Sequence, residues 1–477
     1  MMTRKITLLL TLIVSIIILY GCKEIDYGRF VGVYEIESAT LNGIDITNEY
    51  YLYTIEIRED KTMKVNINYL NILDNHESTF KANNNTLTET YLGKTYKYVF
   101  DETNETLTYK TKTNDEELIV VLKRKEQIDI PKGVAFEGIL FGDDIDLTKR
   151  FNYAPSILIE EEDGQTVMHI WYCANRLSGV IVDHIGYRKG ILNEDNRWEF
   201  SEESYALAPS IDTWDSRHTC DPSVIKGEFN YNNETYTYMM AYLGCTTEDY
   251  SNNETGIAIA KSPEGPWIKM DHLNPIVPWD RDNQSGSWGT GMPSLLSVDG
   301  KGKVLLFYSN ASVGVSVDYY DFTNMDDPIL TFTRNIVSTG LTNPNGTFLN
   351  YVGLADFSYD PFKNRLYMSS YTNTKNPPDV TVTRVNSHGA IHYIDGLDSM
   401  EEVVEAIENQ SYVWQLLDFI GPEDTGYDRN HNLGLVRDAY GYLYNSDQVM
   451  VVVSTGHVDY PNDNIYTYRL MGYIIQP

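Results

Sequence analysis

The sequence predicts an all-β protein in which a small N-terminal β-barrel or sandwich is followed by a five-bladed β-propeller. Short alternating strands separated by Asn-, Asp- and Gly-rich clusters fill the first hundred residues after the N-terminus, and a proline-centred motif recurs from residue 154. The 37 Tyr among 477 residues also favour strands. Because the chain is too long for one ordinary core, we expect two domains, at residues 23–126 and 134–477, joined by a linker at 127–133.

Charge restricts the class of partner. The chain carries 37 Lys and Arg against 68 Asp and Glu, which gives a formal net charge of −31 at pH 7. Nucleic acids and anionic lipids are bound mainly through basic side chains, so we expect no nucleic-acid partner. The acidic balance fits neutral or cationic partners better, and the aromatic residues offer faces on which sugars can stack.

The first 22 residues have the composition of an export signal. Arg4 and Lys5 form a positive segment, residues 6–19 an apolar segment, and the sequence Leu-Tyr-Gly-Cys ends at Cys22. The pattern resembles a bacterial lipoprotein signal, which implies cleavage at Cys22, its lipidation, and anchoring of the exported protein to the bacterial membrane or cell surface. The alternative is an uncleaved anchor helix, and both place the rest of the chain outside the cytoplasm.

Residues 23–126 predict a meandering β-domain without a helix. The expected strands are residues 30–36, 51–57, 62–67, 77–81, 86–91, 96–100, 106–110 and 117–122. The run opens with GRFVGVY at 28–34 and resembles the lipocalin-like domains of bacterial lipoproteins. The resemblance is one of pattern and favours a spacer or binding module, with a ligand-holding barrel as the alternative.

A motif recurs three times in the following domain. It reads APSIL at 154–158, DPSVI at 221–225 and MPSLL at 292–296, with spacings of about 70 residues. Three further strand-like runs follow each copy, at 167–173, 184–188 and 198–200, then 236–243, 256–260 and 266–268, then 304–308, 313–319 and 330–332. Four strands per repeat predict propeller blades.

Two further units lack the proline. One begins at 354–358 and continues at 365–370, 380–385 and 414–419, with a helix at 399–410 that Ser399 caps and Glu402 completes as a capping box. The last begins at 433–436 and continues at 449–453 and 465–470. We expect residues 134–140 to supply its fourth strand, so that the two ends of the domain close the ring.

Three segments carry a family resemblance. DPSVI at 221–225, YMMAY at 238–242 and GIAIAKSPEGPW at 256–267 resemble glycoside hydrolase family 43 and its relatives, over about residues 134–477. The resemblance implies inverting hydrolysis of oligo- or polysaccharides by an Asp base, a Glu acid and an Asp that tunes the pKa of the acid. An acid and a base must flank the bond with room for a water molecule.

The starts of the inner strands are where such carboxylates converge. We assign these starts to Ala154, Asp221, Gly291, Asp356 and residues 430–432, so Asp221 and Asp356 are the predicted catalytic groups. Ala154 stands where the family places its base, and no Glu opens the third or fourth unit. The acid would then come from a loop, with four candidates: Glu264, Glu423, Asp424 and Asp428.

The predicted ligand contacts are polar and aromatic residues near these starts: Trp214, Arg217, His218, Trp288, His431 and Asn432. Arg217 and His218 suit sugar hydroxyls or a uronate, and the two indoles suit stacking. His431 resembles the central histidine of these propellers, which faces a channel ion or water. Structural alternatives stay open: a turn for Asp221, lids over the core for the indoles, and a hydrogen-bonded core histidine for His431.

The cysteines leave their pairing open. With Cys22 assigned to lipid, Cys173, Cys220 and Cys245 remain, and an odd number permits at most one disulfide. They lack the spacing of a zinc site. We expect no required cofactor, and leave open Ca²⁺ or water in the propeller channel.

Three classes of function remain open. An exported, lipid-anchored glycoside hydrolase is the first expectation, because of Asp221 and Asp356. A glycan-binding propeller without catalysis is the alternative, because of Ala154 and the missing Glu. An interaction scaffold is the third, and it predicts no acidic pocket at the ring centre.

Overall fold

The structure is a computed structural model that describes residues 27–47, 50–58, 60–69, 72–113, 116–124, 133–141, 151–175, 182–247, 251–281, 287–372, 387–456 and 468–476. The chain divides into two compact units, Met1–Ile128 and Asp129–Pro477. The predicted signal segment with Cys22, and all of the predicted linker except its last residue, lie outside the described residues. No helix in the described ranges combines the length and apolar character needed to cross a membrane.

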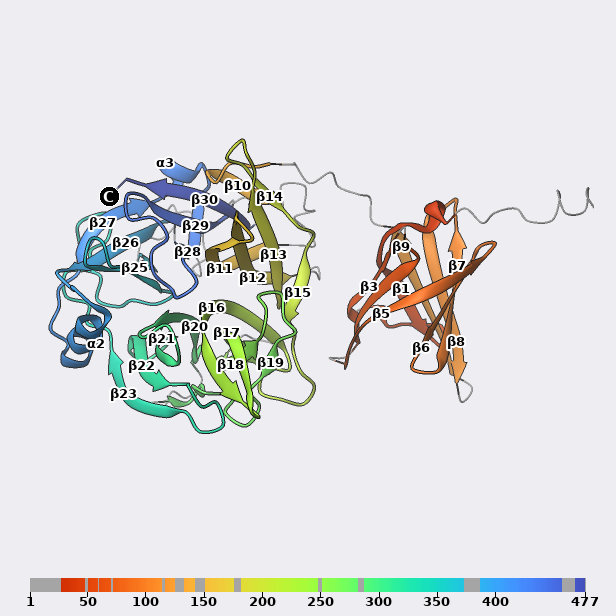
Figure 1. Cartoon of the computed structure of the whole chain (residues 1–477), viewed down its shortest axis with the longest axis horizontal. Coiled ribbons are helices and arrows are strands. Elements are labelled where there is room, and N and C mark those ends of the chain that lie inside the picture. The colour runs from red at the N-terminus through yellow and green to blue at the C-terminus, as the bar shows by residue number, and fades with distance from the viewer. Residues whose placement is uncertain are drawn as a thin grey trace, which may run out of the picture. The chain divides into compact units, whose positions relative to one another are not determined.

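The first unit is one sheet that closes on itself (Figure 1). After a short 3-10 turn, η1 (Gly28–Phe30), its strands follow in chain order: β1 (Gly32–Leu41), β2 (Ile44–Asp45), β3 (Tyr50–Ile57), β4 (Thr62–Tyr69), β5 (Ile72–Asn83), β6 (Thr86–Tyr91), β7 (Lys94–Asp101), β8 (Thr106–Thr113) and β9 (Glu116–Arg124). Antiparallel pairing of β1 with β9 completes the closure. The interior is largely apolar, with Tyr34, Ile55, Leu87 and Phe100 among its buried residues. It also holds the buried Glu89 carboxylate, which lies 2.7 Å from His76. The predicted meander is therefore a barrel rather than a sandwich.

The second unit contains groups of four antiparallel strands, and the groups follow one another along the chain. The groups are β11 (Phe151–Glu162), β12 (Gln165–Asn175), β13 (His184–Leu192) and β14 (Trp198–Phe200); β16 (His218–Tyr231), β17 (Glu234–Cys245), β18 (Glu254–Ala260) and β19 (Ile268–Lys269); β20 (Thr290–Ser297), β21 (Lys303–Asn310), β22 (Gly314–Asp321) and β23 (Ile329–Asn335); β24 (Asp356–Asp360), β25 (Arg365–Tyr371), β26 (Gly389–Asp395) and β27 (Gln415–Ile420). A further strand, β15 (Ser204–Leu207), also pairs with β13.

Strands from both ends of the second unit share the remaining group. β28 (Arg429–Arg437), β29 (Val449–Gly456) and β30 (Arg469–Ile475) are completed by β10 (Gly138–Phe141), which pairs with β30. The prediction that residues near 134–140 supply this strand is confirmed. β28 also makes a short parallel contact with β11, through Ile157 and Val436. The groups stand around a common centre, with β11, β16, β20 and β28 nearest to it (Figure 1).

Two further elements are helices. α2 (Met400–Asn409) begins after Ser399, whose hydroxyl accepts the Glu402 N–H, while the Glu402 carboxylate accepts the Asp398 N–H at 2.9 Å. The predicted N-cap is therefore confirmed, whereas the predicted capping box is not, because Glu402 accepts the N–H of Asp398 and not that of Ser399. α3 (Pro422–Thr425) is a single turn. The third strand of the fourth group is β26, and the strand predicted for that place at 380–385 lies outside the described residues.

Neighbouring inner strands are connected by a repeated hydrogen bond. Backbone N–H groups of β16, β20 and β24 donate to serine hydroxyls of the preceding inner strand: Val224 to Ser156 at 3.1 Å, Leu295 to Ser223 at 2.9 Å, and Phe357 to Ser294 at 2.9 Å. The Leu435 N–H of β28 donates in the same way to the Asp356 carboxylate at 2.8 Å. The serine of the repeated motif therefore fixes each inner strand to the next.

The segment that ends in Gly265-Pro266-Trp267 has a packing role. The Trp171 indole N–H donates to the Pro263 carbonyl at 3.1 Å, and the Trp171 and Trp267 rings meet edge to face, 6.4 Å apart. This contact joins the group containing β12 to the group containing β18. This part of the segments that carry the family resemblance therefore packs two groups of strands together.

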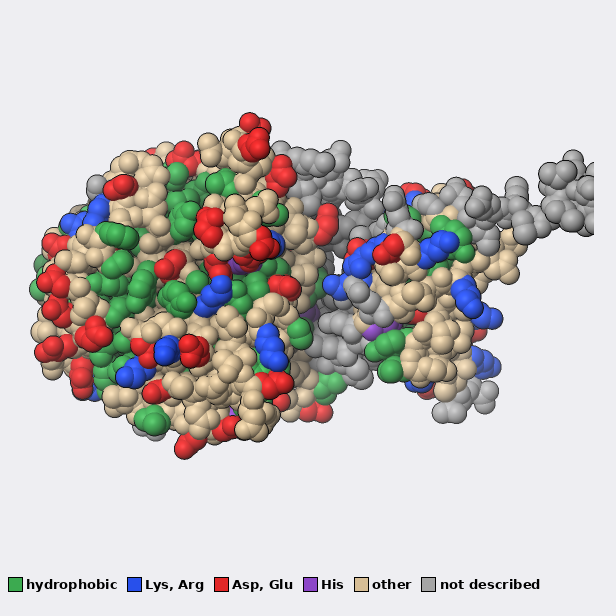
Figure 2. Space-filling view, viewed as in Figure 1, with side chains coloured by type: hydrophobic (Ala, Val, Ile, Leu, Met, Phe, Trp, Pro, Cys, Tyr) green, Lys and Arg blue, Asp and Glu red, His purple; other side chains and the backbone are tan. Residues whose placement is uncertain are grey.

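Acidic side chains outnumber basic ones on the face of the second unit that Figure 2 shows. This distribution agrees with the net charge of −31. A polyanionic ligand would meet repulsion over most of this face.

Candidate central pocket

A pocket lies where the inner strands converge. Its empty space, with open solvent at the mouth included, is about 360 Å³. Each inner strand contributes its first residues: Ala154, Pro155, Ser156, Asp221, Pro222, Met292, Pro293, Leu354, Ala355, Asp356, Asn432 and Leu433. Both predicted catalytic carboxylates, Asp221 and Asp356, therefore line one pocket.

One residue from each inner strand has a left-handed backbone here. Their φ values are +48° for Ala154, +47° for Asp221, +48° for Met292, +53° for Leu354 and +42° for Asn432. In β11, β16, β20 and β28 this residue lies at a break in the pairing register with the next strand. Such bulges redirect side chains, and strained non-glycine residues cluster at functional sites. The five residues are therefore the equivalent positions around the pocket.

This equivalence corrects two of the predicted inner-strand starts. Met292, and not Gly291, corresponds to Asp221 in the third group, and Leu354, and not Asp356, does so in the fourth. Asp356 instead corresponds to Ser223 and Ser294, because it accepts the N–H of the following inner strand as they do. The prediction shifted the fourth strand by two residues.

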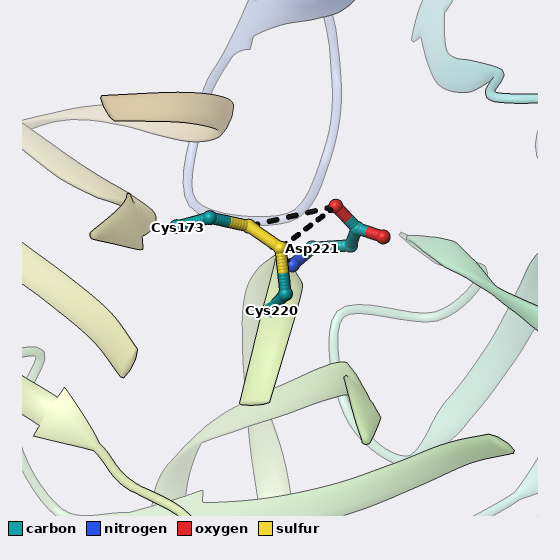
Figure 3. A group of neighbouring side chains, drawn as sticks. All are labelled: Cys173, Cys220 and Asp221. Carbon is teal, nitrogen blue, oxygen red and sulfur yellow. Dashed lines mark hydrogen bonds between the residues drawn. A yellow bond between two sulfur atoms is a disulfide. The ribbon is translucent and has the colours of Figure 1, made fainter. Parts of the chain in front are cut away.

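Asp221 lies in a desolvated wall of the pocket and is 7% exposed. One carboxylate oxygen, Oδ1, lies 3.5 Å from Cys173 Sγ and 3.3 Å from Cys220 Sγ, and the other turns away from the sulfurs (Figure 3). Burial raises the pKa of Asp221 to about 7, an effect that His218 reduces and Asp183 increases. The side chain is therefore close to half protonated at neutral pH.

His218 is buried behind Asp221, outside the pocket lining. Its Nδ1 lies 3.2 Å from Asp183 Oδ2, and the same carboxylate oxygen accepts the Tyr153 hydroxyl at 2.6 Å. Burial alone would lower the pKa of His218, but the hydrogen bond with Asp183 and the neighbouring Cys245 raise it to about 10. His218 is therefore a cation at neutral pH. Asp183 and Tyr153 were missed by the sequence interpretation, since neither lies in a motif.

Asp356 is held by protein donors at both oxygens. Oδ1 accepts the Ser294 hydroxyl at 2.6 Å and lies 3.4 Å from Arg437 Nη1, and Oδ2 accepts the Leu435 N–H at 2.8 Å. These contacts satisfy a carboxylate that would otherwise be costly to bury. The hydrogen bonds and the ion pair of Asp356 therefore give it a structural role. Of the two carboxylates that line the pocket, Asp221 is the one with an oxygen turned away from protein donors.

Arg437 occupies the axis beneath the pocket and is fully buried. Its Nη1 donates to the Leu295 carbonyl at 3.0 Å, and its Nη2 donates to the hydroxyls of Ser156 at 3.2 Å and Ser223 at 3.3 Å. Together with the ion pair to Asp356, these contacts connect Arg437 of β28 to all of the other inner strands, which are β11, β16, β20 and β24. A fixed positive charge at this place disfavours the Ca²⁺ ion that the sequence left open for the channel.

Trp288 is not among the residues that line the pocket, although it packs near one of them, Ala154. Its partly buried ring packs with Tyr153 against a small cluster that contains Ala154, Cys173 and Cys220. The Asn253 amide fixes the backbone by donating to the Trp288 carbonyl at 2.9 Å. Two partly exposed aromatic rings therefore flank the wall that carries Asp221.

Trp214 and Arg217 lie outside the pocket lining. Trp214 packs on Tyr242, with ring centroids 5.4 Å apart, and covers Gly244 and Gly256. A side chain at Gly256 would collide with the indole, because its Cβ would lie 2.3 Å from the ring. Trp214 therefore covers a sheet in the way the lid alternative describes, and Arg217 adjoins it with a partly exposed side chain.

Asn432 lines the pocket, whereas His431 does not. The His431 ring stacks on Tyr468, with centroids 5.8 Å apart. Burial and the neighbouring Arg429 charge lower the pKa of His431 to about 3, so the imidazole is neutral near pH 7. This environment suits a packed histidine better than a proton donor.

None of the four loop candidates for a catalytic acid lines the pocket: Glu264, Glu423, Asp424 and Asp428. Glu423 lies 3.4 Å from His388, and Asp424 accepts the Gly421 N–H at 2.8 Å as a helix cap. Within the described residues, the pocket therefore lacks a second carboxylate with a free oxygen.

The disulfide is now assigned. Cys173 of β12 pairs with Cys220 of β16, which joins two neighbouring groups, and Cys245 is a buried free thiol. The Asp221 N–H donates to Cys173 Sγ at 2.8 Å. The disulfide therefore lies directly against the residue that lines the pocket (Figure 3).

Comparison with known proteins gives fold similarity only. No protein-family model and no curated protein matches the sequence. Similar solved structures include an endo-arabinase from Bacteroides thetaiotaomicron (14% identity, 69% of this chain and 94% of that one, TM-score 0.35) and a family 117 glycoside hydrolase from Zobellia galactanivorans (13%, 72% and 89%, 0.40). A family 43 enzyme from Xanthomonas citri in complex with xylotriose is also similar (13%, 71% and 90%, 0.41). These values assign no function, so the argument below depends on the pocket.

Proposed function

We propose that residues 134–477 form a five-bladed β-propeller whose central pocket binds a carbohydrate without hydrolysing it. The observation that carries this proposal is the state of the two pocket carboxylates. Asp356 is committed to Ser294, Leu435 and Arg437, and the equivalent positions on the inner strands that flank Asp221 are Ala154 and Met292. An inverting hydrolysis needs two carboxyl groups free to act on one bond.

The chemistry of the pocket wall suits a sugar. Asp221 offers a hydrogen-bonding carboxyl group to hydroxyls and Asn432 offers an amide, and the partly buried rings of Trp288 and Tyr153 pack close to the lining residue Ala154. Sugars present both hydroxyl edges and apolar C–H faces, so a polar group beside an aromatic ring is the combination that binds them.

Hydrolysis is the second candidate, and one observation favours it. Burial raises the pKa of Asp221 to about 7, and a carboxyl group that stays protonated near neutral pH can act as a general acid. The water-activating base would then have to come from a residue beyond the pocket lining described above.

The remaining parts of the proposal concern location. We propose that the protein is exported, that Cys22 carries the lipid anchor, and that the N-terminal barrel is a lipocalin-like spacer or binding module. Replacing Cys22 with Ser in the full chain tests the anchor. Loss of lipid labelling and release from the membrane fraction support it, and unchanged membrane association contradicts it.

Calorimetry on arabino-, xylo- and galacto-oligosaccharides tests binding. We expect one member of the panel to bind wild type, and Asp221→Asn and Trp288→Ala each to weaken binding about tenfold or more. Tyr444→Ala is the matched control: this ring is 40% exposed and follows the far end of β28, away from the pocket. Equal affinities for all four proteins would place binding elsewhere, and no binding to any sugar would contradict the proposal.

A further inference from the structure

Three residues form a compact cluster in the pocket wall. The sulfurs of Cys173 and Cys220 and a carboxylate oxygen of Asp221 all lie within 4.8 Å of one another, and all three residues are buried (Figure 3). Their positions in the sequence show no metal-binding spacing, because β12 and β16 bring them together from distant segments. Carbohydrate binding uses Asp221 but gives the sulfurs no role.

We propose that opening the Cys173–Cys220 disulfide with a dithiol reductant creates a binding site for a thiophilic divalent cation, with Zn²⁺ as the reference metal. In this step the dithiol gives two electrons and two protons to the disulfide, which becomes two thiols, and is itself oxidised to a disulfide. Cation binding then releases the two thiol protons and forms two metal–thiolate bonds and one bond to the Asp221 carboxylate.

The distances fit a tetrahedral site. With Zn–S bonds of about 2.3 Å and Zn–O bonds of about 2.0 Å, a sulfur and an oxygen on one zinc ion lie about 3.5 Å apart. Asp221 Oδ1 is already 3.5 Å from Cys173 Sγ and 3.3 Å from Cys220 Sγ. The two thiolates need to lie about 3.8 Å apart, which rotation about their Cα–Cβ bonds allows once the disulfide is open.

The surroundings stabilise the negative charge that such a site requires. The Asp221 N–H points at Cys173 Sγ from 2.8 Å. A backbone donor close to a sulfur favours its thiolate form and orients it as a ligand.

The fourth coordination position faces the pocket. Asp221 belongs to both the cluster and the pocket lining, so a cation and a water molecule can enter through the pocket. Three protein ligands with one open position are the arrangement of zinc sites that exchange their fourth ligand, whereas structural sites have four protein ligands. Cys245 is not part of the cluster, which makes it a matched control for thiol binding in general.

Metal titration of the full chain, reduced with a dithiol and then freed of it, tests the proposal. Zn²⁺ binding is followed by calorimetry, and Co²⁺ binding by its thiolate charge-transfer absorption. We expect the reduced protein to bind one Zn²⁺ and the oxidised protein none. Cys173→Ser should abolish binding, Asp221→Asn should weaken it about tenfold or more, and Cys245→Ser should leave it unchanged.

Several outcomes would overturn the proposal. One is a reduced protein that keeps its tryptophan fluorescence and binds no Zn²⁺. Another is Zn²⁺ binding that survives Cys173→Ser or disappears in Cys245→Ser. If reduction unfolds the second unit, Zn²⁺ must restore the native fluorescence, because the site belongs to the folded state, and failure to do so also contradicts the proposal.

Discussion

Arg437 and Asp356 form an ion pair at the centre of the ring, with Nη1 of the arginine 3.4 Å from Oδ1 of the aspartate. The arginine side chain is fully buried and the aspartate side chain is 16% exposed. A carboxylate that compensates a buried guanidinium and also accepts the Leu435 N–H is part of the fold. This relationship separates Asp356 from Asp221, although both line the same pocket.

Replacing Asp356 with Ala should lower the free energy of unfolding of the second unit by about 3–5 kcal/mol, because Arg437 would be left as an unpaired buried charge. Urea unfolding followed by tryptophan fluorescence reports this unit alone, since all seven Trp lie at or beyond Trp171. Asp326→Ala, at an exposed turn, is the matched control and should change stability by less than about 0.5 kcal/mol. An equal, small effect of both changes would show that Asp356 has no structural role.

Asp221→Asn should stabilise the protein in a pH-dependent way. The pKa of Asp221 is raised from 3.8 to about 7 on folding, so ionisation penalises the folded state. The penalty is absent below about pH 4, grows between pH 4 and 7, and reaches about 4 kcal/mol above pH 7. Unfolding of both proteins at pH 4 and pH 8 measures it. A gain that is the same at both pH values would show that Asp221 titrates normally.

Calcium should leave the second unit unaffected. The Arg437 guanidinium occupies the axis where a channel cation would lie, and like charges at that place repel. The melting temperature followed by tryptophan fluorescence should therefore be the same with Ca²⁺ and with a chelator. A rise with Ca²⁺ that saturates as for a single site would contradict this assignment.

Alkylation under denaturing, non-reducing conditions should modify Cys245 and spare Cys173 and Cys220. The disulfide closes a loop with a sequence separation of 47, so Cys173→Ser should cost about 4 kcal/mol of stability by loop entropy. Cys245→Ser, which breaks no crosslink, is the comparison. Peptide mass mapping that finds Cys245 in a disulfide would overturn the pairing.

The order of the strands could be predicted from the sequence more completely than the site. Alternating runs, the Ser399 cap and the missing fourth strand of the last group are local signals, and the structure contains β28, β29, β30 and β10 in the expected pairing. The strand at 389–395 was missed, because the apolar run at 380–385 looked like a better third strand.

The site was harder to predict because its geometry depends on backbone bulges. The register Ala154-Pro155, Asp221-Pro222 and Met292-Pro293 was visible in the sequence and points to Met292 rather than Gly291. The fourth copy has no proline after Leu354. Without that marker, the sequence interpretation assigned the equivalent position to Asp356 and not to Leu354. Arg437 follows an apolar strand in the sequence. Nothing in that pattern indicated that its side chain contacts residues from all of the other inner strands.

The pairing of the cysteines also could not be predicted from the sequence. Three cysteines allow three pairings, and only the arrangement of β12 beside β16 selects Cys173 with Cys220. The same long-range arrangement places the sulfurs next to Asp221, which is why the metal-ligand set has no sequence signature.

The most direct test of the central claim is to follow the fate of the sugar that binds. The oligosaccharide with the highest affinity for wild type is incubated with an excess of the protein at pH 6 and pH 8, and chain lengths are measured by mass spectrometry. A pocket with Asp221 as its one available carboxylate predicts that the bound oligosaccharide is recovered intact, with Trp288→Ala releasing it. Shortened products that form with wild type and disappear with Asp221→Asn would contradict the account and establish hydrolysis.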